Sequence, residues 1–308
     1  MALAYGFSEY GGPDTQQVFD LEVPRPGPGQ LVVAVHAAGV NPADWKVRTG
    51  TRKDTVPVTL PAVLGREVSG VVTAVGENGR DFSVGDAVFG STARGFGGYA
   101  EYTVLNADSA AHKPEVLGFA AAATVPVALG TALDIVEQLE IVDADTVLVL
   151  GAGGGVGSAV TQLAHARGAA VLGVASAGKS DLVEANSGIW IESGSGSEER
   201  IVAAGERVGK VTVIVDLVGG DVLAHAAAAC GPAVRLVSVA DPGLGSELGG
   251  SGVDRRRTTE VFTRVATLVE TGILDPRIER TFPLREAGHA LALVEEGHAR
   301  GKVVVTVR

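Results

Sequence analysis

The sequence predicts an α/β protein in which a doubly wound parallel sheet is joined to a second, mostly β domain. Three observations support this fold class. Apolar runs typical of buried strands alternate with helical patterns between residues 124 and 270. Short β-rich runs alternate with turn signals over residues 1–123. A glycine-rich turn at residues 151–157 joins a buried strand candidate to a helical pattern.

The β-rich region comes first in the chain. Its strand candidates are the apolar runs Leu31–His36, Val68–Val75 and Ala87–Phe89. Turns are indicated where glycine, proline and asparagine cluster, at residues 11–13, 24–29 and 77–79. Short strands at this spacing indicate a compact, mostly β domain.

The alternating region follows. Strands buried on both faces are expected at Val147–Leu150, Ala170–Ala175, Val211–Asp216 and Val234–Val239. Parallel strands need crossover connections, and the helical patterns between these runs supply them. The chain then continues with a helical pattern over Leu284–Glu296 and a terminal strand over Lys302–Val307.

The glycine turn is the most informative motif. It consists of Gly151, Ala152, Gly153, Gly154, Gly155, Val156 and Gly157. A strand, a glycine turn and a helix together bind a dinucleotide pyrophosphate, because backbone N–H groups and the positive helix N-terminus approach the phosphates. The first key position is Ala152, which such a turn accepts if φ stays negative. A glycine turn without a ligand is the alternative.

The residues after the second strand bear on the choice of cofactor. An NAD-binding unit usually places an acid about 20 residues after the turn, on the ribose 2′-OH. Here residues 174–180 contain no acid, and the first one is Asp181. Ser176 and Lys179 can instead receive a 2′-phosphate, so NADPH is favoured over NADH. The alternative for Lys179 is an ordinary solvated lysine at a helix start.

Composition fits a two-domain, soluble, cytoplasmic enzyme. The chain has 308 residues, 46% of them hydrophobic, and a formal net charge of −11 with one cysteine, Cys230. The negative charge argues against a nucleic-acid partner, and a single cysteine excludes an internal disulfide. No secretory signal is visible, and the most apolar stretch, residues 118–130, is expected to be too short to cross a membrane.

Motifs spread along the chain resemble one family. They are Tyr10–Pro13, Ala37–Lys46, Leu64–Gly70, Val84–Phe89, Gly97–Tyr102, Pro126–Ala132, Gly151–Gly157, Val215–Gly220 and Gly297–Lys302. With them the chain resembles zinc-independent medium-chain dehydrogenases/reductases of the quinone oxidoreductase branch, which includes zeta-crystallin and alkenal or enone reductases. The resemblance implies a GroES-like catalytic domain at 1–123 and 271–308, and a Rossmann NADPH-binding domain at 124–270.

The zinc-dependent relatives provide a negative test. They carry a metal-binding cysteine where this chain has Asn41, and a Gly-His-Glu site where it has Gly65, Arg66 and Glu67. Asparagine does not replace a thiolate on zinc, and a guanidinium offers no lone pair. The histidines show no close ligand pairing. No metal site is therefore expected.

The resemblance also implies catalytic residues beside the nicotinamide. Asn41 would donate to the substrate carbonyl, Trp45 would form an apolar wall, and Lys46 would supply positive charge to the developing oxyanion. A structural role is equally open for Asn41, since Asn-Pro is a common turn pair. Lys46 can equally be an ordinary solvated lysine.

Further cofactor contacts are implied by the resemblance. They are Thr131, Val218, Gly219, Val239, Ala240 and, near the pyrophosphate, Lys302. Asp216 either braces its strand end or contacts the ligand. Residues 254–257, Asp-Arg-Arg-Arg, either start a solvated helix or contact the dinucleotide or an acidic substrate tail.

These expectations combine into one functional hypothesis. The protein reduces quinones, or the activated C=C of enones and alkenals, with NADPH and without zinc. The alternatives are an enoyl-thioester reductase and a nucleotide-binding protein with little turnover. A homodimer is expected, because Val234–Val239 should lie near a sheet edge that can pair with a symmetry mate, and the resemblance implies the same. No nucleic-acid or membrane partner is expected.

Overall fold

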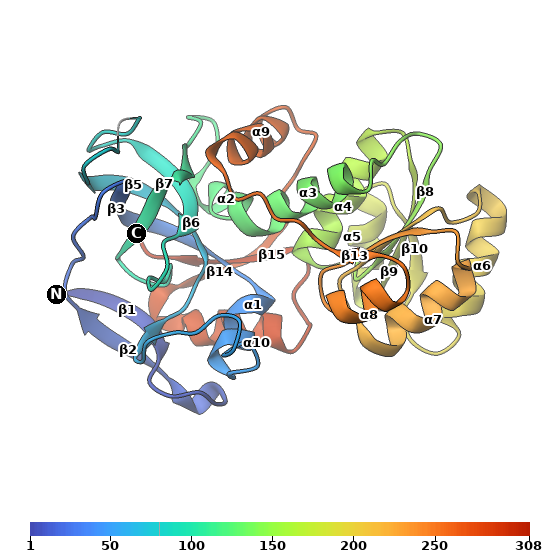
Figure 1. Cartoon of the computed structure of the whole chain (residues 1–308), viewed down its shortest axis with the longest axis horizontal. Coiled ribbons are helices and arrows are strands. Elements are labelled where there is room, and N and C mark those ends of the chain that lie inside the picture. The colour runs from blue at the N-terminus through green and yellow to red at the C-terminus, as the bar shows by residue number, and fades with distance from the viewer. Residues whose placement is uncertain (80) are drawn as a thin grey trace. The chain divides into compact units, whose positions relative to one another are not determined.

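A computed structural model describes residues 1–79 and 81–308, which divide into two compact units (Figure 1). The first unit comprises Met1–Ala128, Arg257–Glu270 and Ile278–Arg308. The second unit comprises Leu129–Arg256 and Thr271–Arg277. The predicted fold class is confirmed, since one unit is mostly β and the other contains a parallel sheet with helical crossovers.

Two sheets build the first unit. One has the order β14-β15-β3-β5-β6-β7, and an additional pairing between β3 and β7 closes it on itself. The other is a small sheet of order β2-β1-β4. The strands are β1 (Ala2–Phe7), β2 (Gln16–Leu21), β3 (Gln30–Val40), β4 (Ala62–Val63), β5 (Glu67–Val75), β6 (Ala87–Thr92), β7 (Tyr102–His112), β14 (Ile278–Pro283) and β15 (Lys302–Thr306). The predicted β-rich runs lie in β3, β5 and β6.

Four α-helices belong to the described part of this unit. They are α1 (Pro42–Arg48), α2 (Phe119–Ala122), α9 (Thr259–Glu270) and α10 (Ala287–Glu295). Short 3-10 turns lie at Pro13–Thr15 and Leu284–Glu286. The core is apolar and comes from alternate strand positions, such as Leu31, Val33 and Val35 of β3, all with no exposed area.

The second unit contains a parallel sheet of order β10-β9-β8-β11-β12-β13. Its strands are β8 (Thr146–Leu150), β9 (Ala170–Ala175), β10 (Ile189–Glu192), β11 (Val213–Asp216), β12 (Arg235–Ser238) and β13 (Ser251–Gly252). Its helices are α3 (Gly130–Gln138), α4 (Gly155–Ala166), α5 (Ser180–Ala185), α6 (Ser197–Val208), α7 (Gly220–Cys230) and α8 (Pro242–Glu247), with a 3-10 turn at Ala177–Lys179. The strand order reverses between β8 and β11. In such sheets ligands bind outside the carboxyl ends of the strands at this point.

The unit boundaries differ from the expected domains. Residues 124–128, expected in the nucleotide-binding domain, belong to the first unit, and two longer segments also change place. Helix α9, expected in the nucleotide-binding domain, belongs to the first unit, because Thr259 Oγ1 donates to the Ala110 carbonyl at 2.6 Å. Residues 271–277, expected in the β domain, belong to the second unit. There the Asp275 N–H donates to Gln162 Oε1 at 2.7 Å. Contacts between distant residues place both segments.

The strand β12, which was expected near the edge of the sheet, is paired over part of its length with one further strand, β13. The two residues of β13 pair with Val237 and Ser238, so β13 and not β12 is the outermost strand. The apolar edge on which we based the expected pairing of two copies is therefore shorter than the sequence suggests.

The apolar segment beginning near residue 118 is longer than expected. The helical segment Phe119–Gln138 includes α2, a π-helical stretch at Val125–Leu129, and α3. By length and composition it is long enough to cross a membrane, which corrects the sequence-based expectation. However, 78% of its apolar window is buried inside the structure, as in a core helix of a soluble protein.

Candidate functional site

The glycine turn lies at the carboxyl end of β8, next to the point where the strand order reverses. Gly151 has φ +88°, a conformation that glycine adopts without strain. A Cβ on Gly157 would overlap the Gly151 carbonyl oxygen and lie 2.8 Å from Ala152 Cα. Only glycine therefore lets the first turn of α4 approach the strand this closely.

Helix α4 directs its N-terminus at this turn. Gly154 is its extended N-cap residue, and the helix continues for 12 residues. The first backbone N–H groups of a helix have no acceptor within the helix, and they carry the positive end of its dipole. Ala152 is fully buried, and its N–H donates to the Val174 carbonyl at 3.0 Å, so the alanine fits the turn. The turn has the chemistry of a pyrophosphate site.

Lys179 lies directly against the glycine turn. A Cβ on Gly153 would overlap Lys179 Cδ and lie 2.9 Å from Lys179 Cβ, so the lysine stem covers the Gly153 backbone. Ser176 is exposed just after β9 and accepts the Lys179 N–H on its carbonyl at 2.9 Å. The structure thus brings together the turn and the two residues expected to receive a 2′-phosphate.

Asp216 braces the next turn along the same edge. Its Oδ1 accepts the N–H groups of Val218 and Gly219 at 3.0 and 2.9 Å, and its Oδ2 accepts the Ser238 hydroxyl at 2.6 Å. The side chain has no exposed area. Of the two roles left open for Asp216, the structure shows the bracing one.

The other residues expected at the cofactor are placed as follows. Val218 is half exposed after β11, and Gly219 has φ +83°. Val239 and Ala240 are partly buried after β12. Thr131 is buried in the first turn of α3. Val218 and Gly219 follow β11, which pairs with β8, and Val239 and Ala240 follow β12, which pairs with β11, so all four share the carboxyl edge of the sheet. Thr131 lies on a helix of the same unit.

The arginines at 254–257 include a structural ion pair. The Arg256 guanidinium donates to Asp134 Oδ1 at 2.9 Å, and its backbone N–H donates to Asp134 Oδ2 at 3.0 Å. It also contacts Glu137 Oε2 at 2.5 Å. Arg256 therefore fixes the chain to α3, in place of the solvated helix start or ligand contact considered from the sequence.

Asn41 lies in the first unit, in a buried polar network with Glu67 and Lys302. The Asn41 amide Nδ2 donates to Glu67 Oε1 at 2.8 Å, and the Lys302 ammonium donates to Asn41 Oδ1 at 2.8 Å and to Glu67 Oε1 at 2.9 Å. None of the three is more than 5% exposed. Removing one partner of such a buried charge pair costs about 3–5 kcal/mol. The structural role considered for Asn41 is therefore present.

Lys302 has partners different from those expected. Its third N–H donates to the Val40 carbonyl at 3.0 Å, so all three ammonium hydrogens are used inside the first unit. Burial and these bonds leave no donor for a phosphate. The expectation that Lys302 contacts the pyrophosphate is not met by this geometry.

Helix α1 carries the other two residues expected at the catalytic site. Trp45 is partly buried against the apolar core of the first unit, and Lys46 Nζ lies 5.5 Å from the centre of its ring. Trp45 Nε1 is buried, and among the described residues it has no hydrogen-bond acceptor. Arg48 fixes the end of α1, donating to Glu295 at 2.7 and 3.0 Å.

Asp44 lies in the first turn of the same helix and is almost fully buried. Its Oδ2 accepts the Asn41 N–H at 2.9 Å and the Tyr99 hydroxyl at 3.0 Å. Its Oδ1 is buried and has no partner among the described residues. Burial raises the pKa of Asp44 from 3.8 to about 6, against the lowering effect of these two bonds.

The residues present do not fit a zinc ion. Within residues 1–79 and 81–308 no group of three or more His, Cys, Asp or Glu side chains could hold a metal. Asn41 Oδ1 already accepts from the Lys302 ammonium, whose charge would repel a cation.

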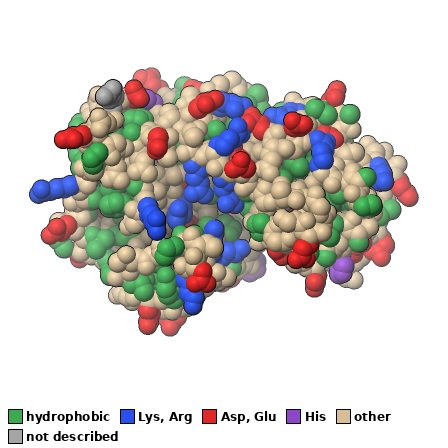
Figure 2. Space-filling model, viewed as in Figure 1, with side chains coloured by type: hydrophobic (Ala, Val, Ile, Leu, Met, Phe, Trp, Pro, Cys, Tyr) green, Lys and Arg blue, Asp and Glu red, His purple; other side chains and the backbone are tan. Residues whose placement is uncertain are grey.

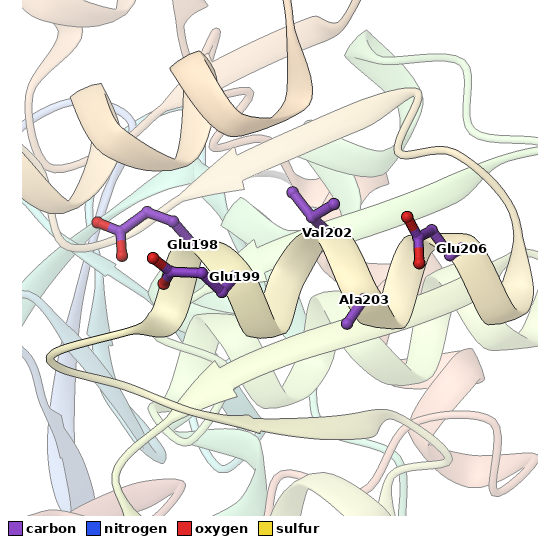
Figure 3. A pocket seen from close by; sticks show the side chains of 5 residues that line it. All are labelled: Glu198, Glu199, Val202, Ala203 and Glu206. Atoms are coloured by element: carbon purple, nitrogen blue, oxygen red, sulfur yellow. The ribbon is translucent and has the colours of Figure 1, made fainter.

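A shallow groove on α6 has the wrong charge for a dinucleotide. Glu198, Glu199, Val202, Ala203 and Glu206 line it, and the glutamates project along one helix (Figure 3). Phosphates would be repelled there. Both basic and acidic side chains are exposed on the visible face (Figure 2).

Glu67, Asp44 and Tyr99 were not expected as site residues. One signal was available: Glu67 begins an otherwise apolar strand, and Lys302 begins another, where an unpaired charge would be costly. The sequence alone does not show that these two charges are partners.

A doubly wound sheet with a glycine turn at its switch point, joined to a mostly β unit, defines a two-domain nucleotide-dependent oxidoreductase. The family description "Alcohol dehydrogenase GroES-like domain" matches residues 27–115, and "Zinc-binding dehydrogenase" matches residues 196–305. The chain belongs to the medium-chain dehydrogenase/reductase family, with the quinone and alkenal oxidoreductases.

Three known proteins show the similarity. The NADPH-dependent alkenal/one oxidoreductase of Arabidopsis thaliana chloroplasts is 32% identical over 98% of this chain and 78% of its own. The quinone oxidoreductase of Sus scrofa is 29% identical over 96% of this chain and 95% of its own. The structure of a Coxiella burnetii quinone oxidoreductase superposes with a TM-score of 0.90 at 30% identity, covering 100% of this chain and 99% of that one.

Proposed function

We propose that this protein reduces quinones, or the activated C=C of enones and alkenals, with NADPH and without zinc. The observation that carries the proposal is the glycine turn with Lys179 packed on Gly153 and no acid between β9 and Asp181. The activities for which the Arabidopsis and pig relatives are named support the same reaction class.

The second unit would hold the cofactor. The glycine turn and the first N–H groups of α4 bind the pyrophosphate, and Ser176 with Lys179 binds the 2′-phosphate. Thr131, Val218, Gly219, Val239 and Ala240 are the proposed further contacts. When bound, NADPH supplies a hydride.

The first unit would supply the group that stabilises the substrate oxygen. A conjugated acceptor spreads its developing negative charge onto a carbonyl oxygen, so a hydrogen-bond donor there lowers the barrier. The Asn41 amide is the proposed donor, Trp45 the apolar wall, and Lys46 a source of positive charge. A plain ketone lacks this delocalisation and would need stronger electrophilic help.

Zinc independence rests on the donor set. The Asn41 Oδ1 oxygen accepts from the Lys302 ammonium, and Arg66 offers no lone pair. We also propose a cytoplasmic homodimer. Its support is the short outer strand β13, which leaves part of the sheet edge available for pairing.

The experiment measures NADPH oxidation with quinones, enals, cyclic enones, enoyl thioesters and plain ketones. Quinones or conjugated carbonyls should be reduced and plain ketones should not. NADPH should bind at least about tenfold more tightly than NADH. Lys179→Ala with Ser176→Ala should remove that preference and leave NADH binding nearly unchanged.

The matched control is Lys210→Ala. This exposed lysine precedes β11, at the amino end of the sheet. Its replacement should therefore leave the preference for NADPH over NADH unchanged. If the protein reduced none of these acceptors, the remaining alternative would be a nucleotide-binding protein with little turnover. Equal binding of NADPH and NADH by the wild type would contradict the cofactor assignment.

A further inference from the structure

Three neighbouring strands bring Asn41, Glu67 and Lys302 to one place. Strand β3 lies between β15 and β5, with Val40 opposite Val303 and Ala38 opposite Val68. Asn41 follows β3, Lys302 begins β15 and Glu67 begins β5. Gly39 leaves room for the carboxylate, since a Cβ there would overlap Glu67 Oε1 and lie 2.7 Å from the Ala123 carbonyl oxygen.

The chemistry of these partners permits one orientation of the Asn41 amide. The Lys302 ammonium only donates, so it must face Oδ1 at 2.8 Å. The ionised Glu67 carboxylate only accepts, so it must face Nδ2 at 2.8 Å. A flipped amide would place N–H against ammonium and oxygen against carboxylate, and both contacts would be repulsive.

The network also determines which donor remains. The amide Nδ2 has two N–H bonds, and one is donated to Glu67. Within the described chain the amide has no other acceptor, so its second N–H is uncommitted. An amide held by only one partner would lose this orientation, and the donor would no longer be preorganised.

Glu67 connects this loop to a second segment. Its other oxygen, Oε2, accepts the Val127 backbone N–H at 2.7 Å. Val127 belongs to the π-helical stretch Val125–Leu129, which precedes α3. One carboxylate therefore fixes both the Asn41 side chain and the start of the segment that leads to Thr131.

We propose that Glu67 and Lys302 are positioning residues for the reduction, because they hold the Asn41 amide with one N–H available to the acceptor oxygen. The inference rests on the proposed function. Neither residue touches the reacting atoms, so both act through Asn41.

The test compares Glu67→Gln, Lys302→Met and the double variant Glu67→Gln/Lys302→Met. Each single change leaves one buried charge without its partner, whereas the double variant removes both charges. Stability in urea should fall in the single variants and recover in the double variant. The turnover number should fall about tenfold or more in all three, with the NADPH dissociation constant changed less than about twofold.

The control is Asp145→Asn/Arg235→Met. This ion pair joins the amino ends of β8 and β12, at the opposite edge from the glycine turn. Its removal should lower stability and leave turnover unchanged. If the double variant of Glu67 and Lys302 regains turnover together with stability, or if the single variants keep full turnover, the positioning role is refuted.

A second readout does not depend on activity. Hydrogen exchange of the Asn41 side-chain N–H that is donated to Glu67, assigned in 15N-Asn-labelled protein by its loss in Asn41→Ser, should be slow in the wild type and fast in all three network variants. Fast exchange in the wild type would overturn the proposed orientation. A wild type without turnover but with a protected amide would refute the proposed function and the positioning role that depends on it, while leaving the amide orientation intact.

Discussion

Asp44 provides the most quantitative test of the structure, through the pH dependence of stability. Burial raises its pKa from 3.8 to about 6 in the folded protein. A pKa difference of about two corresponds to about 3 kcal/mol of unfolding free energy. The folded state holds the proton more tightly, so this contribution is present below about pH 4 and is lost as the pH rises through about 6.

Asp44→Asn removes the titration and keeps an oxygen that can accept the Asn41 N–H. The free energy of unfolding of the wild type minus that of Asp44→Asn should therefore fall by about 2 kcal/mol between pH 4 and pH 7, because at pH 4 part of the full difference is already lost. Other titrating groups that the substitution does not affect contribute equally to both free energies of unfolding, so their contributions cancel in the difference.

Urea unfolding followed by tryptophan fluorescence measures this difference. The chain has two tryptophans, and Trp45 lies in the first unit with Asp44, whereas Trp190 lies in the second. A Trp190→Phe background makes the signal report the first unit. Asp20→Asn, at an exposed position of β2, is the control for an aspartate substitution in the same unit. A flat or rising curve for Asp44→Asn would refute the reasoning.

Three other predictions follow from single contacts. Gly157→Ala places a Cβ on the Gly151 carbonyl oxygen and should weaken NADPH binding more than about tenfold in a fluorescence titration, whereas Gly154→Ala, whose Cβ would lie 3.6 Å from that oxygen, should have a smaller effect. A larger loss for Gly154→Ala would contradict this account of the turn. Asn41→Ala should lower turnover by about tenfold to a thousandfold with less effect on NADPH affinity, and full turnover would make Lys46 or a bound water the better candidate for the donor. Burial raises the pKa of Cys230 to about 11, so mass spectrometry should find no alkylation of the folded protein by iodoacetamide or quinone at pH 8; rapid labelling would show that the thiol is accessible.

The glycine turn shows what a local pattern predicts well. A strand, a turn that needs glycine, and a helix follow one another within residues 146–166, so the interactions that define the turn are close in sequence. Gly151 and Gly157 meet because the chain between them is short. The position of Lys179 against Gly153 follows from the parallel pairing of β8 and β9, which the sequence also predicts.

Asn41 and Lys302 show where the sequence was insufficient. From the residues around it, Asn41 could be either a structural turn residue or a hydrogen-bond donor to the substrate. Lys302 was expected at the pyrophosphate. The structure pairs Lys302 with Asn41 and Glu67, residues 261 and 235 positions away in the chain. Burying an unpaired charge is unfavourable, so each buried charge needs a partner. The residues near it in the sequence do not show which residue that partner is.

The sequence by itself therefore determined the fold class and the cofactor turn, because periodicity and glycine geometry are properties of short segments. Only the tertiary structure decided that α9 belongs to the β unit and that Lys302 is buried beside Asn41. Each of these depends on hydrogen bonds between residues brought together by strand pairing or packing. Such contacts form only once the whole chain has folded.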